Sequence, residues 1–234
     1  MKRLAFDQVP VSEAAEMLEV HPSRVRAMIV DGQLLAEKLG GRWFVDRRSL
    51  EGRLSRPSVA GRPFSVANAW ALLCLSQGQQ PDWISKWELS RLRRRLREDG
   101  IEKLAPRLRG RASRVLFRAH PSLLSKLRDD PRLLPSGVSM AAEHQIDIVE
   151  PNEFEAYVSR EDLEGVEEQN YLEPSWEPNV ILHVAGARWL ERCADHAMGP
   201  VVSALDLLEA DDEKSRRAGR NYLAHQLSSE QPRS

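Results

Sequence analysis

The sequence has few cysteines and no long hydrophobic run, and both shortages restrict what the protein can be. Cys74 and Cys193, the two cysteines of the 234 residues, lie too far apart in the sequence to suggest a small disulfide framework. A reducing cytoplasm is the simpler setting for them. No run of roughly eighteen apolar residues occurs, and the opening residues lack the apolar region of a signal peptide. We therefore expect a cytoplasmic protein that is neither exported nor membrane-spanning.

Signatures of catalysis and of cofactor binding are also lacking. The sequence has no P-loop, no glycine fingerprint for a dinucleotide and no nucleophile elbow. Cys193 and His196 have the spacing of metal ligands, but a zinc site needs three or four ligands and no second pair lies nearby. Helix capping explains the acidic run at residues 209–213 better than a two-metal site does. These observations favour a binding protein that has no enzymatic activity, cofactor or metal.

The net charge of −1 conceals an uneven distribution along the chain. Residues 1–137 contain 26 Lys and Arg against 15 Asp and Glu, a net charge of +11. Residues 138–234 contain 8 against 20, a net charge of −12. A basic half attracts polyanions, whereas an acidic half suits a basic partner or simply keeps the protein soluble.

Residues 1–56 have the pattern of a winged helix-turn-helix. Ser12 can cap a first helix, and Pro22 fits the first position of a second helix that Gly32 ends. The stretches "QLLAEKL" and "RWFVD" then predict two strands joined by a two-residue turn at Gly40-Gly41. The stretch "RRSLEGRL" predicts a closing helix. In such a unit the second helix enters the major groove of DNA, and the hairpin, or wing, offers cations to the phosphates or the minor groove.

The second helix has two distinct faces. Helical spacing places Val25, Met28 and Ile29 on one face, which we expect to be buried. The opposite face is centred on small residues, with an arginine along each edge, so it can approach DNA closely. An ordinary solvated helix and hairpin is the alternative, and Trp43 is interpreted as part of the wing core. The predicted DNA contacts of this unit are Ser23, Arg24, Arg26, Ala27, Lys38, Gly41 and Arg42.

The first unit resembles a known family. The stretch "VSEAAEMLEVHPSRVRAMIVDGQLLAEKLGGRWFVDRRSLEGRL" is similar to the excisionase/MerR-type winged helix-turn-helix proteins, including its paired alanines, its "DG" and its Gly-Arg-Trp wing. The resemblance implies a winged-helix fold that binds DNA. His21 and Val30 depart from the commonest form of the pattern, which leaves open the bases that are read.

Residues 57–66 have the composition of a linker, and residues 67–137 predict a second basic unit. The stretch "VANAWALLCLS" predicts a buried helix, and a long arginine-rich helix follows, capped by Asp82 at its start and ended by Gly100. The stretch "LAPRLRGRASRVLFRAHPSLLSKL" then predicts a strand, a Gly-Arg turn, a strand and a closing helix, which echoes the first unit. We therefore expect a second winged helix, although the arginine run could also be a solvated face. The DNA contacts predicted for it are Arg91, Arg94 and Arg95 on the helix, and Arg109 and Arg111 at the wing tip.

Residues 138–228 predict an acidic domain that binds a protein partner. Strand-like runs at 146–150, 155–158 and 179–184 alternate with a helical stretch, and two helices separated near Asp211-Asp212 follow. We expect residues 229–234 to be a disordered tail. The predicted fold class is mainly α with short β-hairpin wings, plus a C-terminal α/β or α+β domain.

A second resemblance covers most of residues 60–220. The stretches "GRPFSVANAWALL", "PSGVSMAAEHQIDIVEPNEFEAYV" and "VVSALDLLEADDEKSRRAG" are similar to actinobacterial helix-turn-helix antitoxins of the abortive-infection AbiEi kind. Those antitoxins belong to type IV toxin–antitoxin pairs. The resemblance implies an N-terminal part that binds and represses its own operon, and a C-terminal part that counteracts a nucleotidyltransferase toxin encoded nearby.

Three alternatives remain open. An excisionase-like regulator without a toxin is disfavoured because the chain continues far beyond residue 56. A MerR-like ligand sensor is disfavoured because no sustained heptad pattern follows that residue. An enzyme with a DNA-binding appendage has the least support from the sequence.

Overall fold

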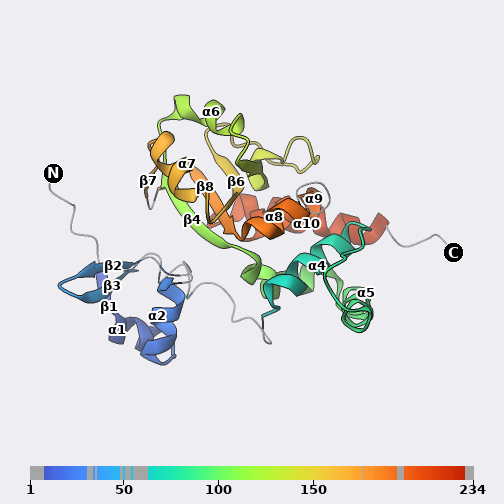
Figure 1. Cartoon of the computed structure of the whole chain (residues 1–234), viewed down its shortest axis with the longest axis horizontal. Helices are drawn as coiled ribbons and strands as arrows, with labels where there is room; N and C mark the ends of the chain where they lie inside the picture. Colours follow the sequence, from blue (N-terminus) through green and yellow to red (C-terminus); the bar gives the residue numbers. More distant parts are fainter. Residues whose placement is uncertain are drawn as a thin grey trace. The chain divides into compact units, whose positions relative to one another are not determined.

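The chain forms two compact units, Met1–Ala60 and Gly61–Ser234, in the computed structural model (Figure 1). Within the described residues, no helix is both long and apolar enough to cross a membrane. Of the predicted linker 57–66, residues 57–62 lie outside the described part of the chain, as do Gly32 and residues 230–234 of the predicted tail 229–234, whose first residue, Ser229, is helical. The structure describes residues 8–30, 34, 36–47, 50, 54, 63–175, 177–193 and 198–229.

The first unit consists of a helix pair and a small antiparallel sheet. The strand order is β1-β3-β2, so the predicted hairpin of β2 and β3 is joined by an edge strand, β1, that the sequence did not predict. Of the predicted closing helix, Arg47, Leu50 and Leu54 are described and are helical. The elements are α1 (Val11–Met17), α2 (Pro22–Val30), β1 (Gln8–Pro10), β2 (Ala36–Leu39) and β3 (Arg42–Asp46).

The turn between α1 and α2 is fixed by the backbone. Glu19 adopts φ 55°, and its N–H bonds to Glu16 O at 3.1 Å, while Val20 N–H bonds to Ala15 O at 3.0 Å. These two bonds form a Schellman motif, which satisfies carbonyls at the end of α1 and redirects the chain. The predicted Ser12 cap is wrong: α1 begins one residue earlier, at Val11, with no side-chain cap.

The wing hairpin turns at two glycines with positive φ. Gly40 and Gly41 have φ values of 55° and 82°, as a two-residue turn of this kind requires. The turn sets the register in which Lys38 lies opposite Trp43. The helices and the sheet of this unit share one core, whose buried side chains include Val25 and Val45.

The second unit is built on a five-stranded mixed sheet with strand order β5-β6-β8-β4-β7. The central pair β6 and β8 is parallel, and the other neighbouring strands are antiparallel. Its strands are β4 (Ser113–Arg118), β5 (Leu133–Pro135), β6 (Phe154–Ser159), β7 (Glu173–Pro174) and β8 (Val180–Ala185). Its helices are α4 (Val66–Ser76), α5 (Lys86–Leu108), α6 (Leu124–Arg128), α7 (Leu163–Gln169), α8 (Ala187–Cys193), α9 (Pro200–Leu208) and α10 (Glu213–Ser229).

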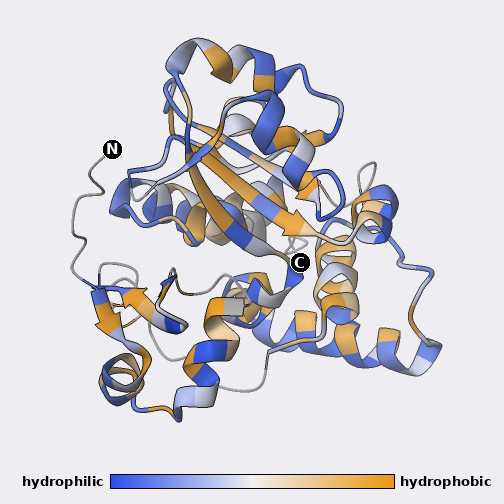
Figure 2. Cartoon of the chain, turned by 60° about the vertical axis from the view of Figure 1, so that its left-hand side comes forward, coloured by the Kyte–Doolittle hydropathy of each residue, from blue (hydrophilic) through white to orange (hydrophobic). Residues whose placement is uncertain are grey.

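Two hydrophobic layers cover the two faces of this sheet, whose strands are largely hydrophobic (Figure 2). Phe154, Ala156 and Val158 alternate along β6 and pack in a cluster with residues of α6 and α7. Tyr157 belongs to the other cluster, which contains residues of α4, α5, α8, α9 and α10. Because successive residues of a strand face opposite sides, residues 155, 157 and 159 all face the α9 side.

The predicted second winged helix is wrong. The first strand of its wing was expected in the stretch that begins at Leu104, but that stretch is helical as far as Leu108. Gly100, with φ 70° and ψ 161°, interrupts α5 where the sequence predicted its end. The helix resumes because Ile101, Leu104 and Leu108 follow helical spacing and bury one face. The predicted second strand of the wing, β4, therefore has no preceding strand with which to form a hairpin.

The predicted boundary near residue 137 is also absent. β4 lies before that position and β8 lies after it, yet the two strands pair from Ser113↔Val184 to Phe117↔Val180. Residues 67–137 and 138–228 thus share one sheet. Two local predictions fail as well: Ser85 rather than Asp82 caps α5, and residues 146–150 do not form a strand.

Candidate nucleic-acid interface

Helix α2 presents the predicted contact residues on its free side. Val25 and Met28 are buried and hold the helix against the core of the first unit. Arg24 and Arg26 are both exposed and flank that buried side. Ala27 is half-buried, and its methyl side chain adds little bulk to the helix surface. An α-helix with its side chains is about 10–12 Å across, which fits the major groove of about 12 Å width.

The start of α2 is organised by His21. Its Nδ1 accepts a hydrogen bond from the backbone N–H of Ser23 at 3.3 Å and lies 2.8 Å from Ser23 Oγ. His21 thus fills the capping role that Ser or Asp more often fills. Ser23 is exposed, as predicted for a DNA contact.

The wing carries the remaining predicted contacts of the first unit. Lys38, Gly41 and Arg42 are exposed at the end of the hairpin. Lys38 Nζ lies 5.9 Å from the centroid of the Trp43 ring, within the range of a cation–π contact. Trp43 itself is half-buried against the core, which agrees with its interpretation as wing core. The wing tip is therefore basic and supported from beneath by an aromatic ring.

The arginines of α2 are available for binding. Within the described residues, neither Arg24 nor Arg26 forms an ion pair with a carboxylate. Arg47 differs, because its guanidinium lies 3.3 Å from Glu13 Oε1 and links the sheet region to α1. Arg47 thus stabilises the first unit through its ion pair with Glu13, whereas Arg24 and Arg26 are exposed and unpaired within the described residues.

The comparisons with known proteins agree with this geometry. A family model described as a helix-turn-helix domain matches residues 11–56. The first unit is therefore a helix-turn-helix domain of the DNA-binding class. No significant match to a curated protein or to a solved structure is found for the chain.

The arginines predicted for the second unit divide into two groups. Arg91, Arg94 and Arg95 are exposed on α5. Arg109 begins a short 3₁₀ helix, Arg109–Arg111, and is half-buried there rather than at a wing tip. Arg111 is 2% exposed and cannot reach a phosphate. The prediction that Arg111 contacts DNA is therefore wrong.

Arg111 instead bridges the sheet and α9. Its Nε donates to Tyr157 Oη at 2.9 Å, and its Nη1 donates to Glu209 Oε1 at 2.6 Å. Its Nη2 forms a buried ion pair with Asp206. Burial alone would lower the pKa of Arg111, but the neighbouring carboxylates raise it well above its ordinary value. The guanidinium therefore stays charged as a structural cation.

The same buried cluster extends to His183. Its Nε2 lies 2.8 Å from Glu155 Oε1 and 3.8 Å from Asp206 Oδ1, and its ring stacks on Tyr157 with 4.8 Å between centroids. Burial lowers the pKa of His183, but Asp206 and Glu155 together raise it by more than burial lowers it. The pKa therefore lies above its ordinary value. The sequence offers a signal for this cluster, because Glu155 and Tyr157 alternate with apolar residues in "EAYV" and a single histidine interrupts the apolar run "VILHV".

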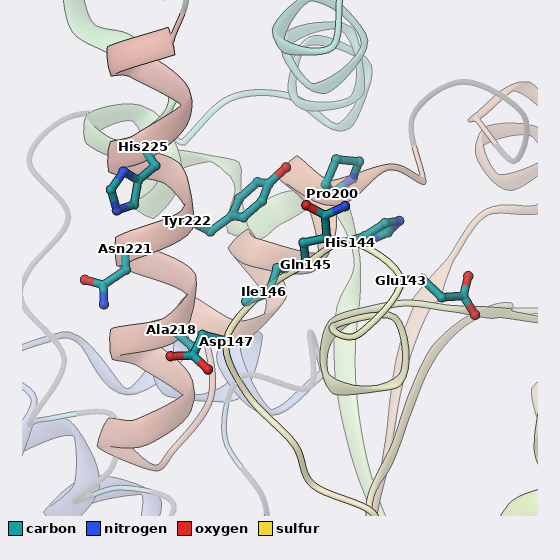
Figure 3. Close-up of a pocket in the computed structure, with 10 residues that line it drawn as sticks. All are labelled: Glu143, His144, Gln145, Ile146, Asp147, Pro200, Ala218, Asn221, Tyr222 and His225. Atoms are coloured by element: carbon teal, nitrogen blue, oxygen red, sulfur yellow. The ribbon is translucent and has the colours of Figure 1, made fainter.

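A pocket of about 610 Å³ lies beside α10 in the second unit. Figure 3 shows that Tyr222 and His225 reach it from α10, whereas His144 and Asp147 come from the loop that precedes β6. His144 Nδ1 lies 3.0 Å from Ser203 Oγ, and burial lowers the pKa of its imidazole. In the part of the chain that is described, no three His, Cys, Asp or Glu residues gather as ligands for a metal ion.

Two further features concern residues singled out in the sequence. Cys74 and Cys193 are buried free thiols that the fold brings together, and the hydrogen bond from Cys193 lowers the pKa of Cys74. His196 lies outside the described residues. Asp212 Oδ1 accepts a hydrogen bond from Ser215 N at 2.7 Å, so the predicted aspartate cap of the last helix is confirmed.

Proposed function

We propose that this protein is a sequence-specific DNA-binding antitoxin that represses its own operon and counteracts a nucleotidyltransferase toxin encoded nearby. The observation that carries the DNA-binding part is the placement of exposed Arg24 and Arg26 on a groove-sized helix, beside a basic wing. In this arrangement α2 reads base edges in the major groove, and Lys38 and Arg42 contact phosphates or the minor groove. The protein acts in the cytoplasm as a binding protein rather than as an enzyme.

The second unit is the part we assign to antitoxicity. Support comes from the AbiEi-like stretches at residues 60–220 and from the surplus of acidic residues after residue 137. The negative charge of residues 138–234 attracts a basic protein. A toxin that handles nucleotides or nucleic acid needs a basic cleft for phosphates, and this part of the chain suits such a cleft.

A transcriptional regulator without a toxin is the second candidate. It is favoured by the extent of the family match, which covers residues 11–56 and thus concerns only the DNA-binding unit. The two candidates share the same first unit and differ in what the second unit binds.

Growth rescue distinguishes the two candidates. The neighbouring nucleotidyltransferase gene is expressed from an inducible promoter, with and without the full-length protein. We expect co-expression to restore growth, and failure to restore it with a folded protein would favour the regulator.

A matched variant separates the two activities. The full-length Arg24→Ala/Arg26→Ala variant should lose repression of a reporter fused to its own promoter and should retain growth rescue. Loss of both activities together would show that antitoxicity acts through DNA rather than through the second unit. Cutting the chain at residue 137 is unsuitable, because it would separate β4 from its partner β8. A truncated variant should instead end between the two units, near residue 60.

A further inference from the structure

The exposed side of α5 has a composition that the fold does not require. From Lys86 to Arg97 the helix has six cations and a single acid, Glu88. The buried side is supplied by Leu89 and Leu92, with Leu96 partly buried. Arg93 donates a hydrogen bond to Gln80 Oε1 at 3.2 Å, but within the described residues the other cations of this stretch form no hydrogen bond or ion pair outside α5. The question is what these cations bind.

Repulsion within this helix is poorly compensated. Arg91 and Arg95 are four residues apart, as are Arg93 and Arg97, and like charges at this spacing destabilise a helix. The pairs that relieve it are long and exposed: Arg91 lies 3.7 Å from Glu88, and Arg94 lies 3.8 Å from Glu98. Exposed ion pairs of this kind contribute little. Within the described residues Arg97 forms no ion pair, so a polyanion would relieve the repulsion.

An exposed tryptophan lies on the same side of the helix. Trp87 is 70% exposed, and the guanidinium of Arg91 lies 5.0 Å from the centroid of its ring. Trp87, Arg91, Arg94 and Arg97 follow one another at intervals of three and four residues, so they share one helical face, here called the α5 arginine face. Tryptophan and arginine together are typical of binding surfaces, whereas solvated helices more often use lysine and glutamate.

We infer that the α5 arginine face binds the phosphate backbone of duplex DNA next to the site held by the first unit. The three arginines extend over about 9 Å of helix, at 1.5 Å per residue, which matches a few successive phosphates. The contact is independent of sequence, because it lies on phosphates and not on base edges. This inference rests on the proposed DNA-binding function, and it gives the second unit a share in the affinity of the whole chain.

A contact with phosphates also explains why this face carries arginine and not lysine. Guanidinium groups donate two parallel hydrogen bonds to phosphate oxygens, which the ammonium group of lysine cannot do. The exposed hydroxyl of Ser90 lies between Lys86 and Arg94 along the helix and supplies another donor. The contact with Trp87 limits the motion of Arg91, which lowers the entropic cost of binding.

Salt dependence tests this inference. The full-length protein and the Arg94→Gln/Arg97→Gln variant are titrated against a duplex from the protein's own promoter at several salt concentrations. Each lost phosphate contact makes the negative slope of log K against log salt shallower by about 0.9. We therefore expect the magnitude of the slope to decrease by about 1 to 2. Affinity at 0.1 M salt should fall by about 10- to 100-fold, as that change in slope implies. The melting temperature should not fall, because both side chains are exposed and their removal relieves like-charge repulsion within the helix.

A charge-matched control separates a local contact from general attraction. The Arg128→Gln/Arg217→Gln variant removes two exposed arginines of α6 and α10 from the same unit. We expect it to bind with the slope of the wild type, and the inference is overturned if the α5 variant has the same slope as this control. The Arg24→Ala/Arg26→Ala variant distinguishes failure of the proposed function, because it removes preference for the promoter while the α5 contribution to the slope persists. Absence of any DNA binding by the wild type would overturn both proposals.

Discussion

Arg111 and Asp206 form a buried ion pair across 95 residues of sequence. Arg111 precedes β4, and Asp206 lies on α9, so the pair joins the sheet to a helix near the end of the chain. Asp206 also accepts a hydrogen bond from Tyr157 Oη at 2.8 Å and another from Ser136 Oγ. The basic and the acidic parts of the sequence thus meet inside one core.

Substitution of Arg111 should destabilise the second unit rather than weaken DNA binding directly. Arg111→Met leaves buried Asp206 with only the more distant His183, 3.8 Å away, as a cation, and breaking a buried ion pair costs about 3–5 kcal/mol. Urea denaturation measures the loss, and substitution of the exposed arginine Arg128→Met is the control. A variant with wild-type stability and a reduced salt slope for DNA would contradict the structural role of Arg111.

The second unit should become less stable as the pH rises, because His183 then loses its stabilising proton. Asp206 and Glu155 raise the pKa of His183 above its ordinary value near 6.5, against the opposing effects of burial and of Arg111. The native state therefore holds this proton more tightly than the unfolded state. Its contribution is fully present below about pH 6.5 and is lost as the pH rises through the raised pKa.

A His183→Gln variant isolates this contribution. Tyr157 also packs on the imidazole but stays neutral, because burial raises its pKa well above its ordinary value. Urea denaturation from pH 6 to pH 9 should show a steeper fall in the free energy of unfolding for the wild type than for the variant. Parallel curves would mean that His183 is not protonated in the native state.

Gly219 allows α10 to approach α9 closely. A Cβ atom at this position would lie 2.4 Å from Ala204 O and 3.1 Å from Leu207 Cβ. Gly219→Ala should therefore destabilise the unit by about 1–3 kcal/mol, although alanine is the better helix former. The exposed substitution Arg217→Ala on the same helix is the control, and thermal unfolding compares the two. A more stable Gly219→Ala variant would show that the helices can move apart without cost.

Local patterns predicted the first unit well. The periodicity of Val25, Met28 and Ile29 located α2, and Gly40-Gly41 located the turn of the wing. The edge strand β1 was missed because three residues, Gln8–Pro10, carry too little pattern. The sequence also placed His21 at the cap position of α2, as a poorer cap than serine or aspartate would be, and its imidazole fills that position.

The second unit shows where local patterns were insufficient. The similarity of "LGGRWFVD" and "LRGRASRVLF" suggested a repeated wing, but the apolar spacing of Ile101, Leu104 and Leu108 was the stronger signal and predicted helix. The pairing of β4 with β8 joins segments about 70 residues apart, and no local propensity specifies such a pair. For the same reason, Arg111 could not be distinguished from the exposed arginines by its neighbours in sequence.

The most direct test of the account concerns Arg24 and Arg26 of α2. Fluorescence anisotropy of a labelled duplex from the protein's own promoter is measured with the full-length protein in dilute buffer and at physiological salt. We expect binding at least about 10³-fold tighter than to a scrambled duplex of equal length, and loss of that preference in the Arg24→Ala/Arg26→Ala variant. A wild-type protein that leaves the promoter duplex unbound even in dilute buffer, or a variant that keeps the full preference, would contradict it.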